Sequence, residues 1–370
     1  MSHSLPQRII HVIPSLDRAG AEKQLSLLAR GLPREEFDVH VCALTRGGPL
    51  ESELTAAGID VAVIGKTWKI DPSAFARLTR YLRQRSPRLV QTWMFAANAY
   101  GRAAALRAGV PHLIAGERCV DRWKTWPQLA IDRRLARYTD RIVVNSTGVR
   151  EFYVRRGLPE EKFVVIANGI EPAAPRPITK ADLLAELELP ADARLIGAVG
   201  RLWPQKRVKD LIWAADLLKV IRDDVHLLVI GDGPQRRRLD RYRRQVRITD
   251  KVHMLGQRDD VPRLMPHFDC LWLASGYEGL PNAIMEAMAA GVPVVATDIP
   301  GNRDLVVPER TGYLVPVGDR AGFARCTQRL LNDSELSARF GHAGRERVLA
   351  EFSFERMVER FAALYREVLG

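Results

Sequence analysis

The sequence predicts an α/β protein made of two domains, each with a doubly wound parallel sheet. The chain has 370 residues, which is more than one hydrophobic core usually serves. Hydrophobic residues make up 46% and charged residues 27%, a balance typical of soluble globular proteins. Short β-branched runs alternate with helical patterns along its length, as in parallel sheets covered by helices on both faces.

The strand candidates fall into two groups. In the first half they are Arg8–Pro14, Asp38–Leu44, Asp60–Ile64, Arg88–Trp93, His112–Ala115, Arg141–Asn145 and Phe163–Ile166. In the second half they are Arg194–Val199, Val225–Ile230, Val252–Leu255, Cys270–Leu273, Val292–Ala296 and Tyr313–Val315. Helical patterns such as Ala21–Gly31 and Ser73–Arg85 lie between the strands, and the last stretch, 352–370, is an amphipathic helix.

A proline-rich stretch, "NGIEPAAPRPITK", separates the halves. A residue that precedes proline is pushed out of the helical conformation, so this stretch is expected to link the domains. We expect a first domain over 1–172, a linker over 173–190 and a second domain over 191–352. Open parallel sheets bind ligands at the carboxyl ends of their strands, so functional residues should follow strands directly.

Composition argues against several classes of protein. No run of 18 apolar residues suggests a transmembrane helix, and the N-terminus lacks a secretory pattern. Four cysteines lie far apart without a CxxC, which indicates neither a zinc site nor a disulfide framework and favours a reducing cytoplasm.

The net charge of +12 is uneven, since residues 1–175 carry 26 Lys and Arg against 17 Asp and Glu. A basic first half suits an acidic partner or an anionic membrane face, although solubility alone also explains it. No aromatic and basic residues interleave as in RNA-binding modules, so nucleic acid is the least favoured partner.

Two glutamates stand out in "SGYEGLPNAIMEAMAAGVPVVATD". Glu278, Gly279 and Leu280 follow the strand "CLWL", and Pro281 and Asn282 open a helix that contains Glu286. Free amides at a helix start bind anions, and Glu278 would lie close to whatever carries the anion. Carboxylates accept hydrogen bonds from ligand hydroxyls. For two glutamates considered alone, a structural Glu286 and a surface Glu278 would be the favoured explanation.

Other candidates also follow strands. "GAVGRLWPQKRV" places Arg201 and Lys206 after a strand, where two cations suit a diphosphate, although basic surface loops are common. Gly20 follows the first strand and lets the backbone approach a phosphate. Gln257 and Arg258 follow a later strand, where they would contact the planar base of a nucleotide.

Several chemistries lack their motifs. The chain has no GxxxxGK[ST], GxSxG or HExxH pattern and no DxD, so no metal and no cofactor is expected. Arg201, Lys206 and helix amides could compensate the charge of a diphosphate instead.

Taken together, these stretches resemble the retaining nucleotide-sugar glycosyltransferases of the GT4 family. "GRLWPQKR", "VIGDGPQRRRL", "LGQRDDVPRLM", "YEGLPNAIMEAMAAGVPVVATDIPGNRDLV" and "TGYLVPVGD" match the family in order and spacing. The resemblance implies a GT-B fold, in which two Rossmann-like domains face each other and the last helix, about 353–370, packs back on the first. It also implies a UDP- or GDP-linked sugar donor and transfer without a metal.

The resemblance assigns roles to the candidates. Glu278 would lie beside the donor sugar, and Glu286 would hold the ribose hydroxyls. Arg201 and Lys206 would bind the diphosphate, while Gly20 and the amides near Asn282, in the stretch that includes Gly279 and Leu280, would approach the phosphates. Gln257 and Arg258 would lie near the base. The implied acceptor is a glycan or a lipid-linked precursor, with the basic first half at the inner face of the cell membrane.

The chain departs from the family where many relatives have a histidine after the fifth strand. Here "LIAGERCVDRW" supplies Glu117 and Arg118, which could orient the sugar or acceptor, and a salt bridge between the two is equally compatible with the sequence. Gln91 and Trp93 also stand where relatives often have histidines.

Two other functions of this fold stay open. A degenerate GT-B protein could bind nucleotide sugar without catalysis. A nucleotide-sugar epimerase is the other, although it would not need Arg201 and Lys206 in this spacing.

Overall fold

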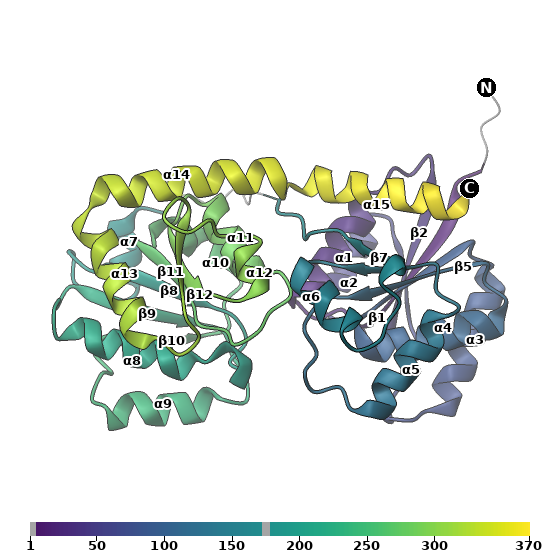
Figure 1. Ribbon diagram of the computed structural model, residues 1–370, viewed down its shortest axis with the longest axis horizontal. Helices are drawn as coiled ribbons and strands as arrows, with labels where there is room; N and C mark the ends of the chain where they lie inside the picture. The colour runs from purple at the N-terminus through teal and green to yellow at the C-terminus, as the bar shows by residue number, and fades with distance from the viewer. Residues whose placement is uncertain (1–4, 172–177) are drawn as a thin grey trace. The chain divides into compact units, whose positions relative to one another are not determined.

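The computed structural model describes residues 5–171 and 178–370, which form two compact units (Figure 1). Unit 1 consists of residues 1–169 together with 354–370, and unit 2 of residues 170–353. Each sheet is entirely parallel, as in doubly wound α/β folds. None of the described helices combines the length and the apolar character needed to span a membrane.

The sheet of unit 1 has seven strands in the order β3-β2-β1-β4-β5-β6-β7. Their bounds are β1 (Gln7–Ser15), β2 (Phe37–Arg46), β3 (Asp60–Val63), β4 (Leu89–Trp93), β5 (His112–Glu117), β6 (Arg141–Val144) and β7 (Phe163–Val165). The helices are α1 (Gly20–Gly31), α2 (Pro49–Ala56), α3 (Pro72–Arg85), α4 (Met94–Ala108), α5 (Trp126–Ala136), α6 (Thr147–Val154) and α15 (Phe354–Leu369).

The two faces of this sheet bury different helices. Alternate residues such as Ile9 and Ile13 pack with α1, α2 and α15, while Ile10 and Val12 pack with α3 and α4. Because successive strand residues point to opposite faces, neighbours in sequence enter different layers. The expected return of the last helix to the first domain is confirmed, since Met357, Phe361 and Tyr365 of α15 belong to the core of unit 1.

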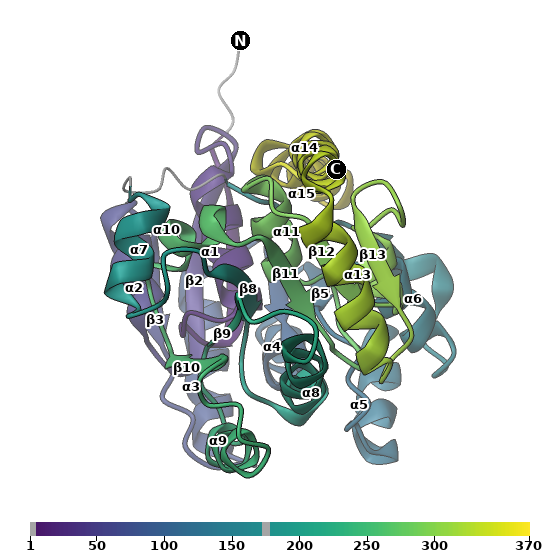
Figure 2. The same cartoon turned by 90° about the vertical axis from the view of Figure 1, so that its left-hand side faces the viewer.

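The sheet of unit 2 has six strands in the order β10-β9-β8-β11-β12-β13 (Figure 2). They are β8 (Arg194–Val199), β9 (Val225–Ile230), β10 (Val252–Gly256), β11 (Cys270–Leu273), β12 (Val294–Thr297) and β13 (Gly312–Val315). The helices are α7 (Lys180–Glu186), α8 (Val208–Lys219), α9 (Arg236–Gln245), α10 (Val261–Leu264), α11 (Asn282–Ala289), α12 (Pro300–Arg303), α13 (Arg320–Asn332) and α14 (Ser334–Glu351).

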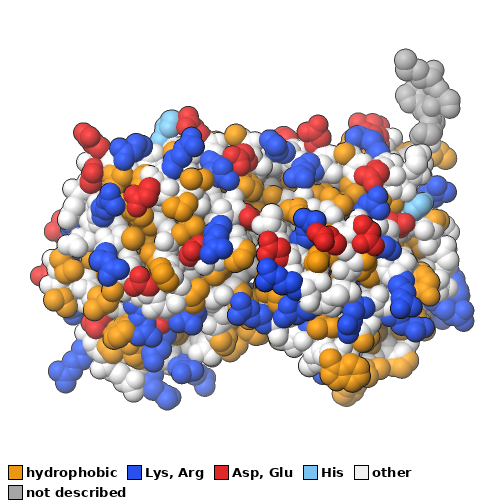
Figure 3. Space-filling view, in the orientation of Figure 1, with side chains coloured by type: hydrophobic (Ala, Val, Ile, Leu, Met, Phe, Trp, Pro, Cys, Tyr) orange, Lys and Arg blue, Asp and Glu red, His pale blue; other side chains and the backbone are white. Residues whose placement is uncertain are grey.

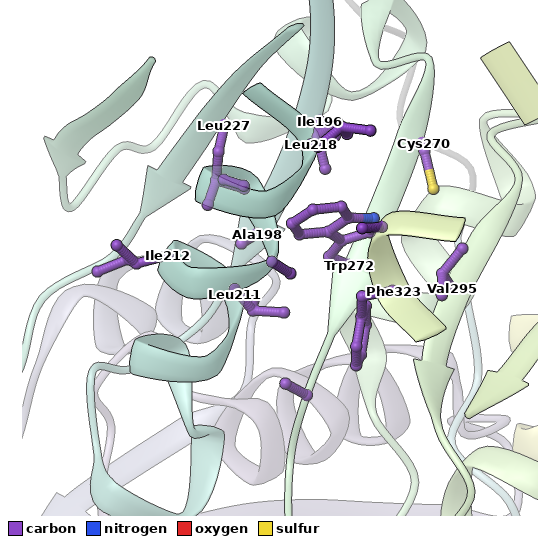
Figure 4. Close-up of a cluster of buried hydrophobic side chains, with 14 of the residues drawn as sticks. Ile196, Ala198, Leu211, Ile212, Leu218, Leu227, Cys270, Trp272, Val295 and Phe323 are labelled. Carbon is purple, nitrogen blue, oxygen red and sulfur yellow. The ribbon is translucent and has the colours of Figure 1, made fainter. Parts of the chain in front are cut away.

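Trp272 of β11 lies at the centre of the unit 2 core, between α8 and α13 (Figure 4). Its ring meets Phe323 edge-on with centroids 5.7 Å apart, and its indole N–H donates to the hydroxyl of Thr327 at 2.6 Å. A buried tryptophan needs such an acceptor, because an unpaired N–H in a core costs free energy. Thr327 of α13, the helix that also contributes Phe323 to this core, therefore provides the acceptor for the indole N–H.

Every strand that the sequence predicts forms in the described part of the chain, with ends displaced by at most two residues. Residues 173–177 of the expected linker, 173–190, lie outside the described residues. The expected linker also contains α7, which belongs to unit 2. Leu183 and Leu184 of α7 are buried, and the ammonium of Lys180 pairs with Asp269 at 2.9 Å.

Candidate active site

The sheet of unit 2 reverses its strand order between β8 and β11. Loops that leave the carboxyl ends of two such strands diverge and create a crevice, which is where open α/β sheets bind ligands. The loop after β8 carries Arg201 and Lys206, and the loop after β11 carries Glu278. The sequence-predicted candidates of these two motifs therefore lie at the expected edge.

Lys206 and Glu278 are joined directly. The Lys206 ammonium lies 2.5 Å from Oε1 of Glu278, and the hydroxyl of Ser275 donates to the same oxygen at 2.6 Å. The Glu278 residue is 9% exposed, and a carboxylate so buried needs charged or hydrogen-bonding partners. The two loops are also tied by their backbones, since the amide of Gly276 donates to the carbonyl of Gln205 at 2.8 Å.

A buried chain of hydrogen bonds holds the Glu278 loop from behind. The hydroxyl of Thr297, at the end of β12, donates to the carbonyl of Ser275 at 2.6 Å. The side-chain amide of Asn302 donates to the carbonyl of Thr297 at 2.7 Å. Both side chains are fully buried. Sequence reasoning missed Ser275, Thr297 and Asn302, although the rule that functional residues follow strands could have found Ser275 and Thr297.

Glycines let the loops approach one another. A Cβ on Gly231, whose φ is +137°, would lie 2.0 Å from the carbonyl oxygen of Gly200. A Cβ on Gly301 would lie 1.9 Å from the carbonyl oxygen of Gly279, beside Glu278. Contacts below 3.0 Å exclude any larger residue unless the backbone moves, so these positions need glycine for the site to form.

Other predicted residues of unit 2 lie around this pair. Arg201 is exposed, and its guanidinium lies 5.6 Å from the ring centroid of Trp203. Gly279 and Leu280 precede α11, Asn282 opens it, and Glu286 lies one turn further on and is half-buried. Pro281 is the residue before the helix rather than within its first turn.

Arg258 and Gln257 follow β10. Gln257 is exposed, whereas the guanidinium of Arg258 forms ion pairs with Asp260 at 2.6 Å and with Glu186 of α7 at 2.9 Å. These carboxylates raise the pKa of Arg258 above its ordinary value. Arg258 therefore joins the loop to α7, and a role near the base remains a prediction for this pair.

Gly20, Glu117 and Arg118 belong to unit 1. Gly20 opens α1 and is exposed. Glu117 is the last residue of β5 and Arg118 follows it. Their side chains point to opposite faces of the sheet, so the salt bridge between them that the sequence allowed does not form. Glu117 instead accepts from Asn98 at 3.0 Å, from Lys124 at 2.9 Å and from the hydroxyl of Tyr153 at 3.0 Å.

Glu117 is part of a buried charge cluster, which we call the Lys124 cluster. Its ionisable members are Arg102, Glu117, Asp121, Lys124 and Asp132. Three carboxylates face two cations, which leaves one excess negative charge when all are ionised. Burial and the neighbouring Glu117 carboxylate raise the pKa of Asp121 to about 6. This cluster was not anticipated from the sequence, because its members come from three separate segments.

Among the described residues, no group of three or more His, Cys, Asp or Glu side chains is arranged to hold a metal ion. Arg201 and Lys206 follow β8, and the amides that begin α11 come after β11, so that a role for these groups at a diphosphate remains a prediction.

Two doubly wound units, with a lysine and a glutamate brought together after the switch-point strands of the second, define a GT-B glycosyltransferase. Residues 18–174 match the family described as Glycosyltransferase Family 4, and residues 179–347 match Glycosyl transferases group 1. The chain belongs to the GT4 family of GT-B glycosyltransferases.

Individual relatives agree with this assignment. The chain is 27% identical, over 91% of each sequence, to the UDP-Gal:alpha-D-GlcNAc-diphosphoundecaprenol alpha-1,3-galactosyltransferase of Escherichia coli. It is 35% identical to the N-acetyl-alpha-D-glucosaminyl L-malate synthase of Bacillus anthracis, over 44% of this chain and 43% of that protein. Its fold matches Anabaena Alr3699/HepE, solved in complex with UDP, with a TM-score of 0.85 at 21% identity, covering 98% of this chain and all of that one.

Proposed function

We propose that this protein transfers a sugar, with retention of configuration and without a metal, from a UDP- or GDP-linked donor to a glycan or lipid-linked acceptor. The observation that carries the proposal is the contact between Lys206 and Glu278 at the switch point of unit 2. With this pairing, the cation proposed to bind the diphosphate and the carboxylate proposed to contact the sugar would act side by side. An epimerase or a protein that only binds nucleotide sugar would not require both.

In the proposed reaction, the bond between the anomeric carbon and the β-phosphate oxygen breaks, and a bond to the acceptor hydroxyl oxygen forms on the same face of the sugar. The hydroxyl proton passes to the departing phosphate. The negative charge that develops on the diphosphate is stabilised by Arg201, Lys206 and the amides that open α11. An ammonium has three N–H donors, so Lys206 can bind the phosphate while it remains paired with Glu278.

Relatives support the donor class. The Escherichia coli relative is named for UDP-Gal, and Anabaena Alr3699/HepE has been solved with UDP-glucose. A relative from Mycobacterium tuberculosis is named a GDP-mannose-dependent alpha-mannosyltransferase, so the base stays open between uracil and guanine. The E. coli relative is also named for a diphosphoundecaprenol acceptor, which supports a lipid-linked acceptor in the synthesis of a surface glycan.

Unit 1 carries exposed aromatic residues that support peripheral contact with an anionic membrane. Trp68 and Ile70 precede α3, and Trp123 and Trp126 lie at the start of α5, with 55% to 83% of each residue exposed. Hydrophobic side chains gather near α5 (Figure 3). Tryptophan favours membrane interfaces, and the adjacent arginines of α3 and α5 would meet anionic headgroups. Flotation with phosphatidylglycerol vesicles, but not with phosphatidylcholine vesicles, is expected for the wild type and not for Trp126→Ala.

A nucleotide-binding experiment tests the central proposal. Thermal unfolding is recorded with UDP, GDP, ADP and NAD, each with and without EDTA, and then with the sugar conjugates of the nucleotide that binds. A ligand at about 100 times its dissociation constant stabilises the native state by about 2.7 kcal/mol. We expect a shift with UDP or GDP that EDTA does not reduce. If every nucleotide leaves the unfolding temperature unchanged, the proposed donor site is wrong.

A further inference from the structure

Three buried side chains of unit 1 hold hydrogen-bonding nitrogens that lack a protein partner. They are Arg118, through Nε and both Nη atoms, Gln91 through Nε2, and His11 through Nε2. None of these atoms has an acceptor among residues 5–171 and 178–370. Arg118 is 8% exposed, and Gln91 and His11 are fully buried. Buried polar atoms form hydrogen bonds in the great majority of cases. Three neighbouring side chains that all have nitrogens without an acceptor therefore require an explanation.

The three side chains lie on the same face of the sheet. His11 of β1 stands opposite Gln91 of β4, and Trp93 of β4 stands opposite Gly116 of β5. Arg118 comes two residues after Gly116 and therefore points to the same face. Its guanidinium lies 4.3 Å from the ring centroid of Trp93 and 5.7 Å from that of Phe361 in α15.

All of the unpaired atoms are donors. The indole N–H of Trp93 donates to Nδ1 of His11 at 3.1 Å, so the neutral imidazole carries its proton on Nε2. Burial, followed by the charge of Arg118, lowers the pKa of His11 to about 3, which keeps the ring neutral at physiological pH. The Oε1 atom of Gln91 accepts from the hydroxyl of Tyr365, so its free atom is the NH₂ group. A guanidinium has donors only.

Among the residues that the structure describes, no carboxylate pairs with the Arg118 guanidinium. Glu117, the residue before Arg118, points to the other face of the sheet. Its carboxylate accepts hydrogen bonds from Lys124, Tyr153 and Asn98. Burial lowers the pKa of Arg118 to about 9, which shows how unfavourable its charged form is here without an anion. A buried, unpaired charge costs several kcal/mol, and an apolar side chain of similar size would avoid that cost. A function that needs the charge would explain why arginine stands at this position.

We propose that Arg118, with Gln91 and His11, binds an oxyanion of the acceptor, either a carboxylate or a phosphate. The inference rests on the proposed function, in which unit 1 receives the acceptor, and it adds that the acceptor is anionic. A guanidinium binds two oxygens of such a group at once, and the ring of Trp93 holds its plane in place. The site lies at the carboxyl end of β5, the edge at which doubly wound sheets bind ligands.

The experiment measures thermal unfolding of the full chain as inorganic phosphate replaces chloride at constant ionic strength. UDP or GDP, whichever stabilises the chain in the nucleotide experiment, is present at saturation, so that the proposed diphosphate site of unit 2 is already filled. The wild type is compared with Arg118→Met and with Arg107→Met, a matched control at an exposed arginine of α4. We expect a saturable stabilisation by phosphate in the wild type and the control, and none in Arg118→Met.

Phosphate-free buffer supplies a second readout. There Arg118→Met should be at least as stable as the wild type, because the substitution removes an unpaired buried charge. A merely structural arginine stacked on Trp93 predicts the opposite, namely lower stability of the variant and no dependence on phosphate. If Arg118→Met does not fold, Arg118→Lys is used instead, because it keeps the charge but cannot bind two oxygens at once as a guanidinium does. The phosphate dissociation constant of Arg118→Lys should be at least tenfold higher than that of the wild type.

Parallel titrations with D-glucuronate and D-glucose identify the source of the oxyanion. A response to phosphate alone assigns a phosphorylated acceptor, and a response to glucuronate alone assigns a sugar carboxylate. Equal responses to glucuronate and glucose, or a phosphate response that survives in Arg118→Met, would overturn the inference, as would a wild type that responds to neither anion. Failure of both UDP and GDP to bind tells against the proposed donor site instead, so the two proposals fail separately.

Discussion

The ammonium of Lys206 lies 2.5 Å from a carboxylate oxygen of Glu278, although 72 positions separate the two residues in the sequence. The contact joins the loops that follow β8 and β11, the strands between which the order of the sheet reverses. It links the residue expected at the diphosphate to the residue expected at the sugar. The following predictions test that relationship and the structure that supports it.

Removing either partner should impair transfer without unfolding the protein. Glu278→Gln keeps the size of the side chain and loses its charge, so we expect kcat to fall by about 100-fold or more, with little change in nucleotide affinity. Lys206→Ala should weaken UDP or GDP binding by about 10- to 100-fold, since a charge-assisted hydrogen bond contributes about 1.5–3 kcal/mol. Lys209→Ala, which removes an exposed lysine three residues away, is the control. Full activity in Glu278→Gln would remove that residue from the mechanism.

Transfer should continue in EDTA. Arg201, Lys206 and the amides at the start of α11 are expected to neutralise the departing diphosphate, so the reaction has no need of a divalent cation. The measurement is the initial rate of sugar transfer after dialysis against EDTA, with magnesium added back to half of the sample. An unchanged rate is expected in both. Loss of activity that magnesium restores would contradict the metal-free mechanism.

The buried hydroxyl of Thr297 should position the Glu278 loop. Thr297→Val keeps the shape of the side chain and removes the hydrogen bond to the carbonyl of Ser275, which leaves that carbonyl without this donor. We expect a loss of about 1–2 kcal/mol in unfolding free energy together with a lower kcat. Thr327→Val removes an equally buried hydroxyl in α13, the acceptor of the Trp272 indole N–H. The control should lose stability alone, and equal kcat values for the two variants would argue against positioning.

A methyl group at Gly301 should disturb the site through the backbone. The added carbon would lie 1.9 Å from the carbonyl oxygen of Gly279, so the segment that carries Glu278 must shift. We expect Gly301→Ala to fold with reduced stability and to lose most of its transfer activity. Gly344→Ala in α14 is the control, since its nearest neighbour would be 3.5 Å away, an ordinary contact. Comparable activities in the two variants would show that the segment tolerates the shift.

Stability should depend on pH through Asp121. Its pKa is raised from 3.8 in the unfolded chain to about 6 in the folded one by burial and by Glu117. Stability that is present below pH 3.8 is therefore lost as the pH rises through 6, by at most about 3 kcal/mol.

Asp121→Asn removes this loss, so the variant should be more stable than the wild type at pH 7.5 and equal to it near pH 4. The gain is reduced by the lost attraction to Lys124, 3.8 Å away. Urea unfolding at the two pH values measures the effect, with Asp192→Asn, at an exposed aspartate, as the control. A variant that is less stable than the wild type at pH 7.5 would show that the pairing with Lys124 dominates.

The sequence by itself determined the elements of the two sheets and the edge at which the motifs lie. Strand and helix periods arise from hydrogen bonds and side-chain directions within a few residues, so local patterns suffice to find β8, β11 and α11. The residues after those strands could then be named in advance, including Lys206 and Glu278. The resemblance to GT4 sequences added their roles.

Tertiary structure decided which of these residues meet and what supports them. The partners of Glu278 come from the loops after β8 and β11, and the residues that hold its loop come from β12 and α12. Arg118 looked equivalent to Glu117 in the sequence. Among the described residues, however, the Glu117 carboxylate has several hydrogen-bond partners, whereas the Arg118 guanidinium stacks on Trp93 and has no hydrogen-bond acceptor. Such differences depend on the order of strands and on the helix that returns to cover each face. They are set by contacts between segments that are distant in the sequence. The hydrophobic periodicity of a single segment predicts its helix or strand but not which other segment it contacts.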